Sequence, residues 1–150
     1  MPWNLYDDLK FGKRNEKKVV HYLNTHGYEQ DGVILYENER NQLDMRNNQF
    51  IGELKTRNCN HDAYPDTMFG YNKILFLRQL NEGRVFKFYF LFKDGLYLWD
   101  FHENEFTVRD FYHQEKGVID QAYVNRKYLK LVDSDLKNDG HFPHETINQN

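Results

Sequence analysis

The chain has little cysteine, no long apolar run and no excess of positive charge. Its 150 residues contain a single cysteine, Cys59, which excludes a disulfide framework within the chain and favours a reducing compartment. No stretch approaches the roughly 18 apolar residues of a membrane-spanning helix, and no charged-then-apolar leader opens the sequence. These absences predict an intracellular protein with no membrane-spanning segment.

The charge balance limits the kinds of partner that the chain can bind. Its formal net charge is −3, which disfavours binding to nucleic acid through a large basic surface. A local basic face or a bound metal ion can still serve such binding in an acidic chain. The sequence has no glycine-rich phosphate loop, no Ser/His/Asp ordering and no zinc-spaced set of cysteines and histidines.

Apolar residues are present in amounts that can build one sizeable core. Hydrophobic types make up 39% of the chain, and it is unusually rich in Phe and Tyr. We expect one domain over residues 1–138, followed by a polar, flexible tail over residues 139–150.

Hydrophobic spacing predicts helices and strands in a definite order. Helices are expected over residues 7–25 and 66–83. Strands are expected over residues 32–39, in both arms of a hairpin within 41–57, on either side of a turn at Asp94–Gly95, and over 106–113. Residues 122–132 form either a closing strand or a short helix. The order is α-β-β-β-α-β with trailing elements, which predicts an α/β domain with a mixed central sheet.

The hairpin segment carries three charged residues that could serve chemistry. A two-residue turn at Asn47–Asn48 would pair Asp44 with Ile51 and put Asp44, Glu53 and Lys55 on one face. Asp44 and Glu53 would then be diagonal neighbours, roughly 7–8 Å apart, so a divalent cation could bridge them. The alternative is an ordinary amphipathic hairpin, whose solvated polar face is held by ion pairs worth about 0–1 kcal/mol.

The first helix places one carboxylate, that of Glu16, among apolar residues. Helical spacing puts it in one stripe with Leu9, Gly12, Val19, Val20 and Leu23. An inward carboxylate without a counter-charge is unfavourable by several kcal/mol or takes up a proton. A metal ion shared with Asp44 and Glu53 would supply the counter-charge. Alternatively, Glu16 lies at the edge of the stripe and reaches solvent or pairs with Lys13.

These residues resemble the motif of the PD-(D/E)xK nuclease superfamily. The likeness rests on Gly12 and Glu16 in the first helix, Asp44 in the first arm of the hairpin and Glu53-Leu54-Lys55 in the second, and it covers residues 7–100. The segment FGKRNEKKVVHYLNTHGYE is most similar to the opening of Holliday junction resolvases and related small DNA nucleases. Leu43 stands where the family name has Pro. The resemblance implies a restriction-endonuclease-like core with extra C-terminal β elements.

The resemblance also implies a function. It implies a metal-dependent DNA endonuclease that hydrolyses phosphodiester bonds in recombination or repair, with branched or junction DNA as one substrate class. Asp44, Glu53, the carbonyl of Leu54 and Glu16 would hold one or two Mg²⁺ ions, for which Mn²⁺ could substitute. Lys55 would position or deprotonate the attacking water. Paired incisions would call for a homodimer.

Three further groups could contact DNA. Lys73 falls on the apolar side of the second helix and could reach the site as a phosphate contact. The loop over residues 56–66 offers Arg57, His61 and Tyr64, which suit phosphate binding or base stacking. The basic outer face of the first helix carries Lys10, Lys13, Arg14, Lys17 and Lys18, and of these Lys13, Arg14 and Lys17 are the candidate contacts. Each group also has a structural explanation, as a lysine stem packed along the core, a polar loop or a solvated face.

Two other classes of protein fit the same sequence. One is a nuclease-like fold that binds nucleic acid or protein without catalysis, and the other is an aromatic-rich structural domain. The enzyme should bind Mg²⁺ or Mn²⁺ at Asp44 and Glu53, whereas the binding module need not. The structural domain predicts that Glu16 lies far from Glu53.

Overall fold

The computed structural model describes residues 5–27, 32, 34–35, 45–80 and 83–138, and it describes the side chains of the first helix from residue 14 onward. The elements in chain order are α1 (Leu5–His26), β1 (Ile34–Leu35), β2 (Met45–Arg46), β3 (Phe50–Thr56), β4 (Asp66–Gly70), α2 (Tyr71–Leu80), β5 (Val85–Phe92), β6 (Gly95–Asp100), β7 (Phe106–His113), β8 (Gly117–Asn125), the 3₁₀ helix η1 (Arg126–Tyr128) and β9 (Lys130–Asp133).

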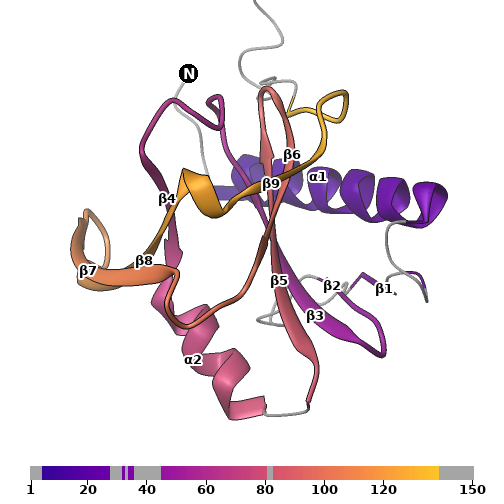
Figure 1. The fold of residues 1–150 in the computed structure, drawn as a ribbon. Coiled ribbons are helices and arrows are strands. Elements are labelled where there is room, and N and C mark those ends of the chain that lie inside the picture. The colour runs from indigo at the N-terminus through magenta and orange to yellow at the C-terminus, as the bar shows by residue number, and fades with distance from the viewer. Residues whose placement is uncertain (1–4, 28–31, 33, 36–44, 81–82, 139–150) are drawn as a thin grey trace, which may run out of the picture.

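The strands of the described residues form two sheets (Figure 1). The larger sheet has the order β1-β2-β3-β5-β6-β9, in which β3 and β5 are parallel and the other neighbours are antiparallel. The smaller sheet is antiparallel, with the order β4-β8-β7. The connection between the parallel strands β3 and β5 passes through β4 and α2. The chain is therefore an α/β domain with a mixed sheet, as predicted.

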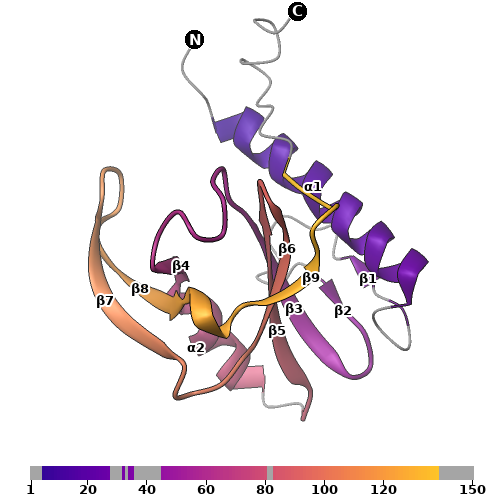
Figure 2. The same ribbon diagram turned by 45° about the horizontal axis from the view of Figure 1, so that its top comes forward.

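The large sheet is covered on both faces. Helix α1 lies on one side of β3, β5 and β6, while α2 and the smaller sheet lie on the other (Figure 2). On the α1 side the buried cluster contains Val19, Val20, Tyr22, Leu23, Met45, Phe50, Leu54, Tyr89, Leu91 and Leu96. On the α2 side it contains Ile51, Phe69, Ile74, Leu77, Phe88, Phe90, Phe92, Tyr97, Trp99, Ala122 and Val124. Strand β5 contributes to both clusters, which explains its unbroken apolar sequence.

Several of the predicted elements are confirmed. The first helix spans Leu5–His26 and ends before Gly27, whose φ of +67° is the left-handed conformation that glycine adopts easily. The turn at Asp94–Gly95 joins β5 to β6, and residues 106–113 form β7. Residues 122–132 contain the end of β8, η1 and the first part of β9. Of the strand expected over 32–39, Ile34–Leu35 form β1, and the tail over 139–150 lies outside the described residues.

The helix predicted over residues 66–83 is wrong in its first part. Residues Asp66–Gly70 form β4, and α2 begins only at Tyr71. Thr67 and Phe69 are buried while the residues between and beside them are partly exposed, which is the two-residue alternation of a strand. Strand β4 pairs along its whole length with β8, more than 50 residues later in the chain. A distant partner therefore decides the conformation of this segment.

The predicted register of the hairpin is also wrong, by two residues. Arg46 pairs with Ile51 and Met45 with Gly52, so the turn is centred one residue later than Asn47–Asn48. The reason is Asn47, which is buried and begins the turn: its side-chain oxygen accepts hydrogen bonds from the backbone N–H groups of Gln49 (2.7 Å) and Phe50 (2.9 Å). A two-residue shift preserves which side chains share a face.

Candidate functional site

Glu53 is a buried carboxylate on the central strand β3. Its residue exposure is 1%, and it alternates along the strand with Phe50, Gly52 and Leu54, which face α1. Ile51 and Glu53 therefore point to the other side, toward α2. The alternative of an amphipathic hairpin with a solvated polar face is wrong for this residue, because α2 and the smaller sheet cover that face of the strand.

Lys73 of α2 is a charged partner of Glu53. Its Nζ atom lies 3.2 Å from Oε1 of Glu53, and the side-chain exposures are 20% for Lys73 and 1% for Glu53. An ammonium group at this distance stabilises the charged form of a buried carboxylate. Lys73 thus contacts the motif residue Glu53, with its head group pointing inward. Its expected role as a phosphate contact stays a prediction.

A cleft of about 620 Å³ opens beside this ion pair. Lys55, two residues after Glu53 on the same face of β3, and Lys73 both line it. The remaining wall comes from the first turn of α2 and from the end of the β7–β8 hairpin, which contributes His113, Lys116 and Asp120. Lys55 and Lys116 line the cleft in addition to Lys73, which pairs with Glu53, and among the described residues Asp120 is the one acidic lining residue. The cleft is therefore suited to an anionic ligand such as a phosphodiester.

The other residues predicted for the metal site are placed differently. Asp44 lies outside the described residues. Glu16 is partly exposed on α1, and the neighbouring Asn15 is buried with 5% exposure. Helix α1 packs on the face of β3 that carries Leu54, opposite to the face of Glu53. A shared site of Glu16 with Glu53 stays a prediction, as does a ligand role for the carbonyl of Leu54.

The basic outer face of α1 is described only in part. Arg14, Lys17 and Lys18 are exposed. Exposure is required of a nucleic-acid contact surface, but an ordinary solvated face would also have it. The side chains of Lys10 and Lys13 lie outside the described part of the chain. A DNA-binding role for this face stays a prediction.

Arg57 continues the row of polar side chains on β3 beyond Lys55. Its backbone N–H donates to the carbonyl of Leu91 at 2.8 Å and so extends the parallel pairing of β3 and β5. Its guanidinium donates to the carbonyl of Met68 in β4 and to Oγ1 of Thr67 at 3.4 Å. Burial lowers the pKa of this guanidinium, an effect that the nearby Cys59 partly opposes. The side chain thus links the large sheet to the small one.

His61 and Asp94 form a contact that the sequence did not suggest. The backbone N–H of His61 donates to Oδ1 of Asp94 at 2.9 Å, and its ring atom Nδ1 lies 2.5 Å from Oδ2. The hydroxyl of Tyr97 lies 2.9 Å from the same Nδ1 atom. Ligand atoms of His61, Asp62 and Asp94 lie within 4.8 Å of one another, a donor set that could also hold a metal ion. His61 and Asp94 are 33 positions apart in the sequence, and no local sequence pattern predicts that they meet.

Asp94→Asn should weaken this contact in a pH-dependent way. Burial raises the pKa of Asp94, but the hydrogen bonds from His61 outweigh it, so the pKa falls below the ordinary 3.8. A depressed carboxyl pKa contributes stability above the unfolded-state value, and this contribution is lost as pH falls through the folded-state value. We expect the substitution to lower the free energy of unfolding by about 1 kcal/mol at pH 6.

Urea denaturation between pH 2 and 6 would check this expectation. The difference between the two proteins should shrink as pH falls below 3.8 and through the lower folded-state pKa of Asp94. Asp110→Asn, at an exposed position in β7, is the matched control and should change stability little at any pH. A difference for Asp94→Asn that stays constant down to pH 2 would contradict the assignment of the effect to the carboxylate.

No family model matches the chain, and no curated protein matches it. None of the described helices has the length and apolar character needed to cross a membrane. The functional conclusion therefore depends on the geometry of the site.

Proposed function

We propose that this chain is a metal-dependent DNA nuclease of the PD-(D/E)xK type that hydrolyses phosphodiester bonds. The observation that carries the proposal is Glu53, a carboxylate with 1% exposure on the central strand, followed on the same face by Lys55 at the wall of a lysine-lined cleft. A buried charged group beside a cleft is characteristic of functional sites. Charged residues are rarely this buried unless they are paired or serve a function.

The arrangement of elements supports a restriction-endonuclease-like core. The motif strand β3 is central and parallel to β5, and α2 lies in the connection between them. Helices α1 and α2 lie on opposite sides of the sheet (Figure 2). The departure from the α-β-β-β-α-β order is β4, which lies between the motif strand and α2 and belongs to the smaller sheet.

The proposal also requires that Asp44, which lies outside the described residues, come close to Glu53. Met45 pairs with Gly52 in an antiparallel ladder. If that ladder continues by one residue, Asp44 comes directly opposite Glu53, closer than the diagonal position expected from the sequence. The proposal therefore needs a two-residue turn at Asn48–Gln49, which the described residues have, and continued pairing of β2.

The donor types in this part of the chain fit Mg²⁺ or Mn²⁺. The carboxylates of Glu53 and Asp44 are hard oxygen donors, which these ions prefer, and the carbonyl of Leu54 and Glu16 are the further candidates. When bound, such an ion polarises the scissile phosphate and stabilises the leaving oxygen. Lys55 can bind the phosphate from the cleft and orient the attacking water. Lys73 places a positive charge 3.2 Å from Oε1 of Glu53.

One observation favours a second candidate, a nuclease-like module that binds nucleic acid without cutting it. The ammonium of Lys73 already lies 3.2 Å from Glu53, so the fold does not need a metal ion to balance this carboxylate. Such a module would use the same cleft through Lys55 and Lys116. The two candidates differ in whether the protein binds Mg²⁺.

Lys73→Met should separate these candidates through thermal stability. Removing the ammonium takes away the positive charge 3.2 Å from Oε1 of the buried Glu53, which should lower the free energy of unfolding by about 3 kcal/mol. In a nuclease, Mg²⁺ should restore part of this loss and raise the melting temperature of the variant more than that of the wild type. A ligand that binds the folded state and not the unfolded state raises the melting temperature, and in this variant Lys73 no longer competes with Mg²⁺ for Glu53.

Lys130→Met is the matched control for this measurement. Lys130 also pairs with a carboxylate, Asp100 at 3.0 Å, but its side chain is 70% exposed. Its loss should change stability by less than about 1 kcal/mol and should not alter the response to Mg²⁺. A Lys73→Met protein whose melting temperature does not respond to Mg²⁺ or Mn²⁺ would favour the binding module.

The activity itself is tested with a panel of labelled DNA substrates. The panel contains a four-way junction, a flap, a blunt duplex and a single strand, each incubated with Mg²⁺, with Mn²⁺ and with a chelator. We expect cleavage that requires the divalent ion and leaves 5′-phosphate ends. Absence of cleavage on every substrate, with DNA binding retained, would overturn the nuclease and leave the module.

A further inference from the structure

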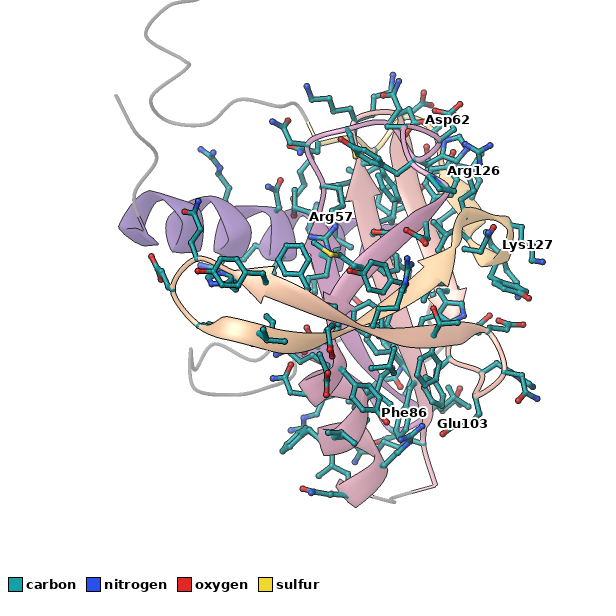
Figure 3. The ribbon with its side chains drawn as sticks, turned by 90° about the vertical axis from the view of Figure 1, so that its left-hand side faces the viewer. Arg57, Asp62, Phe86, Glu103, Arg126 and Lys127 are labelled. Carbon is teal, nitrogen blue, oxygen red and sulfur yellow. The ribbon has the colours of Figure 1, made fainter. Side chains whose placement is uncertain are left out.

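A second cavity of about 330 Å³ lies apart from the lysine-lined cleft. It is bounded by the loop that follows β3, by β4, and by the end of β8 with η1. None of the residues that line it also lines the cleft of Lys55 and Lys73. In Figure 3 Arg57 lies inside the molecule, while Asp62 and Arg126 lie together near its upper edge. The volume is that of a small-molecule site.

Two guanidinium groups line this cavity, and neither is neutralised by a carboxylate of the described residues. Arg57 donates to Oγ1 of Thr67 and to the carbonyls of Met68 and Thr56, and Arg126 donates to the carbonyl of Asp62 at 2.8 Å. These neutral acceptors hold the groups in place and leave their charges unbalanced. Because a guanidinium has five N–H donors, both retain donors for a ligand.

The acidic residue of this cavity does not oppose an anion. The carboxylate of Asp66 lies 2.7 Å from Nη2 of Arg109 and is balanced by it. The lowered pKa of Arg57 shows that burial disfavours its charge, and a bound anion would relieve this cost. The two guanidinium groups therefore favour a ligand that carries negative charge, while Asp62 and Asp94, which lie beside the lining residue His61, oppose it.

The rest of the wall is apolar and aromatic. Tyr64, Phe92, Tyr123 and Leu129 line it, and Tyr64 is 65% exposed at its mouth although its ring is large and apolar. One guanidinium, that of Arg109, already lies 3.6 Å from the ring centroid of Tyr123, so this ring contributes a fixed surface. Aromatic rings of this kind stack on planar ligands, nucleobases included.

We propose that this cavity binds one nucleotide, with its base against Tyr64 and the apolar wall and its phosphate at Arg57 and Arg126. Arg57 follows directly after the end of β3, two residues beyond Lys55 and about 7 Å farther along an extended chain. A nucleotide held there would belong to the DNA strand whose phosphate lies at Lys55. The inference that this nucleotide is part of the DNA substrate rests on the proposed nuclease function, whereas the inference that the cavity binds a nucleotide does not.

The single cysteine provides a local reporter of occupancy. Cys59 lines the cavity, and burial raises the pKa of its thiol, an effect that Arg57 partly opposes. Alkylation by iodoacetamide at about pH 8.5, followed by mass spectrometry, measures its access. Deoxynucleoside 5′-monophosphates should slow this alkylation in a saturable way, and inorganic phosphate should do so at least tenfold more weakly. Phosphate that protects equally well would overturn recognition of the base.

Variants at the mouth of the cavity test where the nucleotide binds. Tyr64→Ala and Arg126→Gln alter exposed side chains, and we expect each to weaken protection about tenfold. Tyr112→Ala, 69% exposed on β7, and Lys127→Gln, beside Arg126 but outside the cavity, are the matched controls and should have no effect. Protection that is unchanged in both test variants would overturn the proposal.

The same variants separate this proposal from the nuclease function. Protection of Cys59 by mononucleotides requires no cleavage, so it can succeed when every DNA substrate stays intact. If the nucleotide comes from the DNA substrate, Tyr64→Ala should raise KM for DNA about tenfold with little change in kcat. Protection by free mononucleotides but not by a single-stranded oligonucleotide would assign the cavity to a free nucleotide. Cleavage without any protection would overturn the cavity proposal alone.

Discussion

Glu53→Gln is expected to reduce Mg²⁺-dependent DNA cleavage by about 100- to 1,000-fold, the usual loss when one electrostatic group of an active site is removed. The change keeps the shape of the side chain and removes its charge. Glu53 is 1% exposed, so solvent cannot replace the missing carboxylate. Initial rates on the best substrate of the DNA panel, measured over a range of Mg²⁺ concentrations, would check this expectation.

Companion variants identify the role of each residue in this loss. Lys55→Ala should lower kcat while leaving Mg²⁺ binding in place, because Lys55 lines the cleft and contributes no oxygen ligand. Asp44→Asn should lower both cleavage and Mg²⁺ affinity. Lys130→Ala, at an exposed pair far along the chain, is the control for loss of one lysine. Full cleavage by both Glu53→Gln and Asp44→Asn would rule out the proposed site.

Loss of activity in Glu53→Gln must be distinguished from loss of folding. The substitution removes the negative charge 3.2 Å from Nζ of Lys73, so some destabilisation is expected. In the double variant Glu53→Gln with Lys73→Met the pair is removed as a unit, and stability should recover relative to either single variant. Cleavage should not recover. A double variant that is stable and inactive would assign the loss to chemistry.

Trp99→Ala is expected to lower the free energy of unfolding by about 4 kcal/mol, the largest effect on stability that we predict. Trp99 is fully buried in β6. Its ring contacts Phe88 of β5 with centroids 5.2 Å apart, Phe69 of β4 at 6.0 Å and Phe106 of β7 at 6.2 Å. The indole thus fills the space between the two sheets, and the cavity left by alanine would separate them.

Denaturation by urea or heat measures this effect. Trp99→Phe should cost less, because it keeps most of the packing and loses the hydrogen bond from Nε1 to Oε1 of Glu105 at 3.0 Å. Tyr112→Ala, an exposed aromatic residue, should stay within about 0.5 kcal/mol of the wild type. A Trp99→Ala protein as stable as the Tyr112→Ala control would contradict the packing of the smaller sheet on the larger.

The sequence by itself determined the elements that depend on local pattern. The apolar spacing of Val19, Val20 and Leu23 specifies α1, because these positions recur on one side of a helix. The Asp94–Gly95 turn between two aromatic runs specifies the β5–β6 hairpin. Period-two alternation also places Glu53 and Lys55 on one face. This assignment stayed correct although the predicted register was wrong, because the register differs by two residues and an even shift keeps side chains on the same face.

Only the tertiary structure decided the features that depend on distant partners. The segment at Asp66–Gly70 is a strand because β8 pairs with it, although its own sequence continues into a helix. Glu53 is buried because α2 and the smaller sheet cover a hairpin face that looks solvated in sequence. His61 meets Asp94 because two loops converge. Such contacts join residues tens of positions apart, and no local propensity encodes them.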